Sequence, residues 1–237
     1  MIVMPIRPKP ALPLLIASIA LAPTPALADA LQQQIVAAAR GVTPEDFAFT
    51  QSGVNQRSGE AAKDYVLVYD PRRPRGTRWT LVRAEGRAPT AKETAGFAKQ
   101  ANAGRVPSYG DIAKWFGGPA VRVAASKTSV TYRFASLAAG TVKLASHDAS
   151  ADTAAEAVVN TAGPTPFVET VHLTSGKPFR MMLVARIERI DMTAHYQMMA
   201  NGRPAIVGTS ATMTGSLLGK PGWFKGNAGF SDIRAVR

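Results

Sequence analysis

The side chains that most often carry out chemistry are few and scattered along this chain. Its three histidines, His147, His172 and His195, stand alone, without a second histidine or an acidic residue at the spacing of metal ligands. A Ser-His-Asp triad can form from residues far apart in sequence, but the G-x-S-x-G turn that presents a hydrolase serine is absent. With no cysteine, the chain has no thiol nucleophile and no disulfide. The sequence therefore predicts a protein that is not an enzyme and that holds neither a metal nor a cofactor.

The stretch GSLLGKP, residues 215–221, has the glycines and the lysine of a phosphate-binding loop. It has one residue too few before Gly219 and Lys220, and Pro221 stands where such a loop requires Ser or Thr and lacks a backbone N–H. The stretch is instead predicted to be a glycine-rich turn between two strands.

A basic loop is the first candidate for ligand contact. The sequence DPRRPRGTR, residues 70–78, places four arginines around two prolines: Arg72, Arg73, Arg75 and Arg78. The prolines stiffen the loop and hold the guanidinium groups apart, an arrangement suited to a phosphate or carboxylate partner. The loop is predicted to contact anions, with a solvated hairpin tip as the alternative.

A methionine-rich pair of strands is the second candidate. In IDMTAHYQMMANGRPAIVGTSATM, residues 190–213, apolar and polar residues alternate, so one face collects Ile190, Met192, Ala194, Tyr196 and Met198. A two-residue Asn-Gly turn would place Ala200 opposite Arg203. The predicted pairs on the dry face are then Met198 with Ala205, Tyr196 with Val207, Ala194 with Thr209, Met192 with Ala211, and Ile190 with Met213.

This dry face supports two interpretations. Small residues leave room and methionines adapt to irregular shapes, so the face could line a groove for an apolar ligand. The same mixture would serve a sheet curled around a helix, in which case the face is half of a core. The residues predicted to line the groove are Met192, Tyr196, Met198, Val207 and Met213.

The N-terminal residues predict export. Two basic residues precede the apolar run ALPLLIASIALA, which is too short to span a bilayer, and small residues stand at Ala26 and Ala28. We expect a signal peptide over residues 1–28, cleaved before Asp29 or, as the alternative, before Leu31. Because the chain lacks the cysteine of a lipid-attached protein, the product should be free to diffuse in the periplasm or be secreted.

The chain is strongly basic, with a formal net charge of +12 at pH 7. Removal of residues 1–28 would take away two basic residues and no acidic one, leaving +10. An exported basic protein meets anionic lipid headgroups or cell-wall polymers rather than nucleic acid. An anionic membrane surface is therefore an expected partner, and nucleic acid is not.

The remaining chain contains the elements that must position these residues. Helices are predicted at 31–41, ending at Gly41, at 90–104, with a capping box of Thr90 and Glu93 and an end at Gly104, and at 111–116. Strands are predicted at 47–51, 64–70, 77–86, 120–126, 129–135, 140–146, 155–161, 167–174, 181–199, 205–214 and 223–236. The polar stretch 53–60 predicts a turn, and the alanine-rich stretch 149–159 could be helix instead of strand.

This order of elements predicts an α+β fold. We expect one domain over residues 29–237, in which a strongly curved antiparallel sheet, an incomplete barrel, covers an N-terminal helix and inserted short helices. The chain has no internal repeat and no linker long enough to separate two domains.

The same order resembles the LolA/LolB lipoprotein-carrier superfamily over most of the chain after residue 28. The opening helix LQQQIVAAARG followed by FAFTQ is similar to the start of that family, where a helix runs into a strand with an F-x-Q-like ending. The resemblance implies a curved, incomplete barrel with helices in its mouth that holds acyl chains on its concave side. No site residue of the family can be carried over to a position of this chain.

Two functions are consistent with these patterns. The first is that of an exported soluble protein that binds a lipid or a lipoprotein on the apolar concave face of its sheet. The alternative is a non-enzymatic interaction or scaffold protein of the envelope, whose core is closed by its own helices. An open pocket over Met192, Tyr196 and Met198 would distinguish the first from the second.

Overall fold

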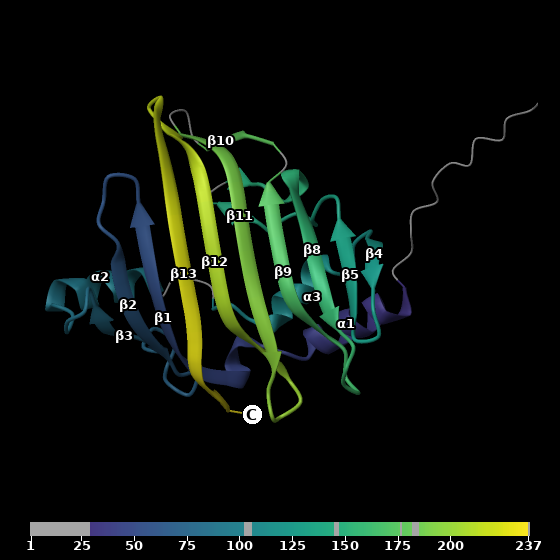
Figure 1. Cartoon of the computed structure of the whole chain (residues 1–237). Helices are drawn as coiled ribbons and strands as arrows, with labels where there is room; N and C mark the ends of the chain where they lie inside the picture. The colour runs from purple at the N-terminus through teal and green to yellow at the C-terminus, as the bar shows by residue number, and fades with distance from the viewer. Residues whose placement is uncertain (1–28, 102–105, 145–146, 176, 182–184, 237) are drawn as a thin grey trace, which may run out of the picture.

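The computed structural model describes residues 29–101, 106–144, 147–175, 177–181 and 185–236. In this part of the chain, helices pack on one face of a large curved antiparallel sheet, an α+β fold (Figure 1). We call that face the inner face. The predicted signal peptide, the predicted helix end at Gly104 and residues 182–184 of a predicted strand lie outside the described residues.

Within the described residues, the sheet has eleven strands, and all neighbouring strands are antiparallel. Ten follow the order β3-β2-β1-β13-β12-β11-β9-β8-β5-β4, and β10 pairs beside them with β11. Their bounds are β1 Phe47–Arg57, β2 Lys63–Tyr69, β3 Trp79–Ala84, β4 Val121–Ala125, β5 Ser129–Phe134, β8 Thr153–Asn160, β9 Phe167–Ser175, β10 Phe179–Met181, β11 Ala185–Met198, β12 Pro204–Leu217 and β13 Lys220–Ala235. A separate hairpin joins β6 Lys143–Leu144 to β7 His147–Asp148.

The α-helices of the described chain lie in two segments outside the sheet. One is α1 Ala30–Arg40 followed by the 3-10 turn η1 Pro44–Asp46, which leads into β1. The other contains α2 Ala91–Ala101, η2 Tyr109–Asp111 and α3 Ile112–Trp115, and it leads from β3 at one edge of the sheet to β4 at the opposite edge. Figure 1 shows α1 and α3 behind β9, β8 and β5, and α2 near β2 and β3. A third 3-10 turn, η3 Ser150–Asp152, precedes β8.

The start of α2 follows the predicted capping box, and α1 begins with a cap at Asp29 that was not predicted. In α2, the Thr90 N–H donates to Glu93 Oε2 at 2.7 Å and the Glu93 N–H donates to Thr90 Oγ1 at 3.3 Å, which confirms the capping box. At α1 the Asp29 carboxylate accepts from the Gln32 N–H at 2.9 Å, and the helix ends at Gly41 as predicted. Both helices are therefore fixed at their N-termini by side chains that satisfy free backbone donors.

Three local predictions need correction. The turn predicted at 53–60 is wrong over its first half, because β1 continues to Arg57 with β2 on one side and β13 on the other. The strand predicted at 140–146 is confirmed only at Lys143 and Leu144 of β6, since residues 140–142 form a turn and a bend and residues 145–146 lie outside the described residues. The helix alternative for 149–159 is wrong, because alternate residues from Thr153 to Val159 are buried in β8 between β5 and β9.

The register of the β11–β12 hairpin is partly as predicted. Three predicted pairs are confirmed: Ile190 with Met213, Met192 with Ala211, and Ala194 with Thr209. Two predicted pairs are wrong: Tyr196 lies opposite Ile206 rather than Val207, and Met198 lies opposite Pro204 rather than Ala205.

The cause of this shift is the turn. The predicted two-residue turn is a three-residue loop, in which the Met199 N–H donates to the Arg203 carbonyl oxygen at 3.1 Å and Gly202 adopts a φ of +76°. This loop moves the pairing by one residue. A bulge beside Tyr196 leaves Val207 without an opposite residue and restores the predicted register farther from the turn.

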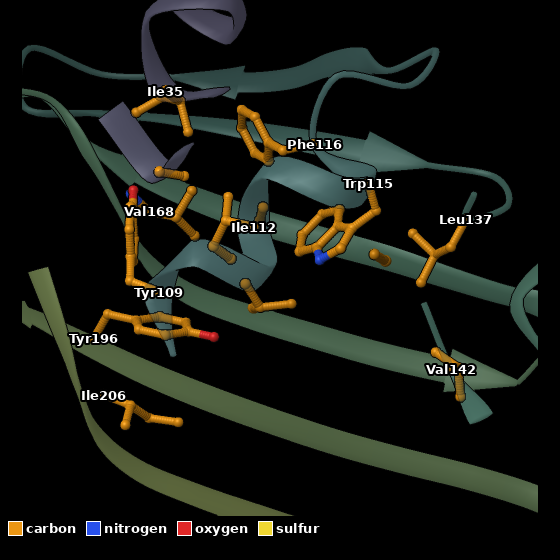
Figure 2. Close-up of a cluster of buried hydrophobic side chains, with 14 of the residues drawn as sticks. Ile35, Tyr109, Ile112, Trp115, Phe116, Leu137, Val142, Val168, Tyr196 and Ile206 are labelled. Atoms are coloured by element: carbon orange, nitrogen blue, oxygen red, sulfur yellow. The ribbon is translucent and has the colours of Figure 1, made fainter. Parts of the chain in front are cut away.

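A closed core fills the inner face under α1 and α3. Ile35 of α1 and the α3 side chains Ile112 and Trp115 pack with Phe116 against β5, β8 and β9 (Figure 2). Gln32 is buried in the same region, and its Nε2 donates to the carbonyl oxygens of Phe116 and Gly118. The first helix is thereby attached to the end of α3 by a satisfied polar contact as well as by apolar packing.

We predict that Gly53, in the middle of β1, does not tolerate a side chain. A Cβ at this position would overlap the Tyr65 hydroxyl and lie 2.5 Å from the Asn227 carbonyl oxygen. Gly53→Ala should lower the free energy of unfolding by about 1–3 kcal/mol, measured by chemical denaturation. Gly229→Ala is the matched control on β13, because a Cβ there meets nothing within 4 Å and should change the stability little.

Candidate functional site

The centre of the inner face carries small residues side by side. Ala211 on β12 lies opposite Gly226 on β13, and Thr209 lies opposite Ala228. Ala228 in turn lies opposite Gly53 on β1. Because these residues extend little from the sheet, the side-chain layer is thin here.

Two pockets open over this thin layer. The first, of about 390 Å³, is lined by Met192, Phe224 and Phe230 from the sheet and by Pro107 and Asp111 from the connection that contains η2. The second, of about 500 Å³, lies between β1–β3 and α2, where Leu81 and Phe97 line it. Asn55, Tyr65 and Phe224 line both pockets, so the two adjoin. We call them together the inner groove.

A third, smaller pocket continues from the inner groove toward the β12–β13 turn. It has a volume of about 190 Å³ and is lined by Ile187, Met213, Leu217, Trp223 and Phe224. We call it the upper pocket. Since Phe224 lines it as well, that ring stands where all three cavities meet.

The polar groups of the inner groove include several uncharged ones. The Tyr65 ring covers Gly53, and its hydroxyl accepts from Gln51 Nε2 at 3.3 Å. Burial raises the pKa of the Tyr65 hydroxyl, which therefore stays protonated at neutral pH. In the first pocket, amides and hydroxyls among apolar side chains suit a ligand that is mostly apolar and carries a few polar atoms. The second pocket is also lined by charged side chains: Arg57, Glu60, Lys63, Asp64, Glu85 and Glu93.

The predicted ligand-binding residues are divided between this space and the core. Met192 lines the inner groove and Met213 the upper pocket. Tyr196 is 9% exposed and packs edge-on against Tyr109 of η2, with ring centroids 5.3 Å apart (Figure 2). Met198 and Val207 are half-buried near the same end of the hairpin and line neither space.

Closure by η2 explains this division. The Tyr109 hydroxyl accepts from the Val168 N–H at 2.9 Å, which fixes the Tyr109 ring over Tyr196. Burial, together with the neighbouring Tyr109, raises the pKa of the Tyr196 hydroxyl. At this end the inner face is core, and the open space lies farther along β11 and β12.

The lining also includes residues that the prediction missed. Phe224 and Phe230 on β13 and Tyr65 on β2 belong to strands that the sequence did predict, but they were not assigned to the site. The alternation of Phe224, Gly226, Ala228 and Phe230 with polar or absent side chains is a usable signal in the sequence. These residues lie near Met192 only because β13 pairs between β1 and β12 in the sheet. No local sequence pattern predicts that strand order.

The basic loop lies between β2 and β3, at the end of the sheet opposite the β12–β13 turn. Arg72 binds the Asp70 carboxylate through two contacts of 2.8 Å and thereby lowers the pKa of Asp70 to about 2. Arg78 pairs with Glu45 at 3.0 Å, and Arg73 donates to the Thr80 hydroxyl at 2.9 Å. Arg75 lines a pocket of about 250 Å³ beside Trp79. Two of the four predicted anion contacts are thus already neutralised by carboxylates of the chain.

The histidines take part in separate local contacts. His147 stacks on Phe179 with ring centroids 4.2 Å apart, His172 Nε2 lies 3.1 Å from Asp191 Oδ1, and His195 Nδ1 lies 3.3 Å from Thr170 Oγ1. Within the described ranges, no group of three or more His, Cys, Asp or Glu side chains is arranged to hold a metal ion.

No helix in the described part of the chain has the length and apolar character needed to cross a bilayer.

No protein-family model, curated protein or solved structure matches this chain. The similarity to the LolA/LolB superfamily therefore stays a prediction from the order of elements.

We predict different costs for truncating two residues of the same hairpin. Tyr196→Ala removes a ring from the closed core and should lower the free energy of unfolding by about 3–5 kcal/mol. Met192→Ala removes a side chain that borders the inner groove and should cost less than about 2 kcal/mol. Urea unfolding curves of the two variants measure this difference, and equal losses would show that Met192 is packed as tightly as the core.

Proposed function

We propose that this protein binds a lipid or a lipidated partner in the inner groove and is not an enzyme. The observation that carries the proposal is the adjoining pair of pockets, one of which lies over Ala211, Gly226 and Ala228 of the sheet. Pockets that bind small organic molecules measure about 300–1,000 Å³ and are lined mainly by apolar side chains with a few polar groups. Each of the two pockets of the groove lies within that range.

The shape of the groove supports an elongated, flexible ligand. Its two pockets and the upper pocket meet at Phe224, so the space is longer than any one of them. Met192 and Met213 border this space and can adapt to a chain that has no fixed shape. An acyl chain, in an incomplete barrel of the kind that LolA/LolB-like carriers use, fits these features better than a rigid polar metabolite.

The alternative, an envelope scaffold protein with a closed core, has support at the other end of the sheet. There Tyr109 and the α3 side chains cover the inner face of β5, β8 and β9, and the space is filled. A carrier would bind its ligand at the centre of the sheet, whereas a scaffold protein would not. A substitution that blocks the groove and leaves the core intact therefore distinguishes the two functions.

We predict that filling the inner groove abolishes ligand uptake without unfolding the protein. Ala211→Leu adds apolar volume at the thinnest part of the side-chain layer and should weaken binding of a fluorescent acyl probe at least about tenfold. Thr212→Leu is the matched control, since the neighbouring residue of β12 faces the other side of the sheet. Probe titration in the absence of membranes is the measurement, with a thermal unfolding curve for each variant. A parent protein that takes up no probe, or equal loss in both variants, would support the scaffold alternative.

We further propose that the protein is exported and begins at Asp29 after cleavage. The Asp29 carboxylate caps α1 and also accepts from Arg122 Nε at 2.7 Å and from the Tyr132 hydroxyl at 2.9 Å. Although burial favours the neutral form, these hydrogen bonds hold the pKa of Asp29 below its usual value. Cleavage before Leu31 would remove all of these contacts.

We predict Asp29 as the first residue of the protein recovered from the periplasm of an expressing bacterium. N-terminal sequencing is the measurement. A chain that begins with Met1 in the cytoplasm would end the export proposal. A chain that begins with Leu31 would show that the Asp29 contacts are dispensable.

A further inference from the structure

The turn between β12 and β13 presents two adjacent leucines to solvent. Leu217 is 58% exposed and Leu218 is 73% exposed, and Leu218 is the most exposed large apolar side chain in the described part of the chain. The turn lies at the upper end of the sheet in Figure 1, where the two strands extend beyond their neighbours. We call residues 217–220 the leucine tip.

Leu218 occupies a backbone conformation that disfavours leucine. Its φ is +51°, and Gly219 follows with a φ of +78°. Left-handed positions in such hairpin turns favour Asn, Asp or Gly, because other side chains meet the neighbouring carbonyl oxygen. Leucine at this position adds neither turn stability nor core burial, which makes the turn a candidate for a contact outside the chain.

The segment of chain that carries the leucine tip is basic. Residues 215–225 contain Lys220 and Lys225 and no acidic residue. The Lys225 ammonium lies 5.2 Å from the centre of the Trp223 ring, which is half-buried on the same hairpin. Proteins that insert into a membrane interface carry such a combination of side chains: exposed leucines, a half-buried tryptophan and adjacent lysines.

The leucine tip is also continuous with the binding space. Leu217 and Trp223 line the upper pocket together with Met213 and Phe224, and Phe224 leads into the inner groove. These four residues connect the tip to the groove, and Arg186 lines the same pocket.

We propose that the leucine tip inserts into the surface of an anionic lipid bilayer, with the lysines on the phosphate groups. A bilayer fits this tip better than a protein does, because a stable protein interface buries about 800 Å² on each partner and two leucines on a projecting turn supply only a small part of that. The charge of the hairpin selects the anionic surface. Membrane docking is a separate property from ligand binding in the inner groove.

The test uses the full protein and sedimentation with vesicles of equimolar phosphatidylglycerol and phosphatidylcholine. The parent should bind these vesicles, more weakly at high salt, and Leu217→Ser/Leu218→Ser should bind at least about tenfold more weakly. Val121→Ser/Val123→Ser is the matched control, since it removes two exposed apolar side chains from β4 at the edge of the sheet and should bind like the parent. Leu218→Asn keeps the turn conformation, so it should retain or raise the melting temperature while weakening vesicle binding.

Three results would overturn the proposal. The first is that the leucine variant binds the vesicles as well as the parent does. The second is that the leucine and valine variants lose vesicle binding equally. The third is that vesicle binding is lost only when Arg72, Arg73 and Arg75 are replaced by serine, which would assign membrane contact to the basic loop instead. Uptake of the acyl probe without vesicles should be unchanged in Leu218→Asn, because Leu218 lines neither the inner groove nor the upper pocket. Failure of membrane docking and failure of ligand binding are thereby distinguishable.

Discussion

The connection between β3 and β4, together with α1, has to cover a wide sheet with helices that are much shorter than the sheet is wide. The 36 residues between Ala84 and Val121 lead from one edge to the other of a path of ten strands, which at a spacing of about 4.8 Å spans roughly 45 Å. Once part of that connection coils into α2, whose 11 residues rise only about 17 Å, it covers separate patches rather than the whole inner face. The division of the sheet into a covered end and an open centre follows from this constraint.

The side chains are distributed in agreement with that division. Under α1 and α3 the sheet supplies large residues, such as Tyr132 and Phe134, which the helices bury completely. In the centre it supplies small residues, Ala211 opposite Gly226 and Thr209 opposite Ala228, and a pocket lies over them. The same sequence therefore forms a packed core at one end and retains an accessible apolar surface at the other. Elements with few packed neighbours are also those that can adapt to a ligand at little energetic cost.

Local patterns predicted the elements well and the site only in part. The alternation from Ile190 to Met198 identified the correct face of β11, because a strand with one wet and one dry side has to show a period of two. The predicted two-residue turn is wrong because Asn201 stabilises a longer loop. Its side chain accepts from the Arg203 N–H at 3.1 Å within a loop one residue longer. The location of the open space along that face depended on Tyr109, which is far away in sequence and whose packing no periodicity reveals.

The pairing of β1 with β13 joins the first strand of the chain to the last, from Phe47 opposite Ala235 to Arg57 opposite Phe224. Contacts of such large sequence separation make folding slow, because a long loop has to close before they contribute any stability. During synthesis, β1 and β2 are made long before β13, so the edge of β1 that pairs with β13 has no native partner until β13 has been made. The centre of the sheet therefore forms late. That timing suits a protein that, if exported as we propose, crosses a membrane before it acquires its structure.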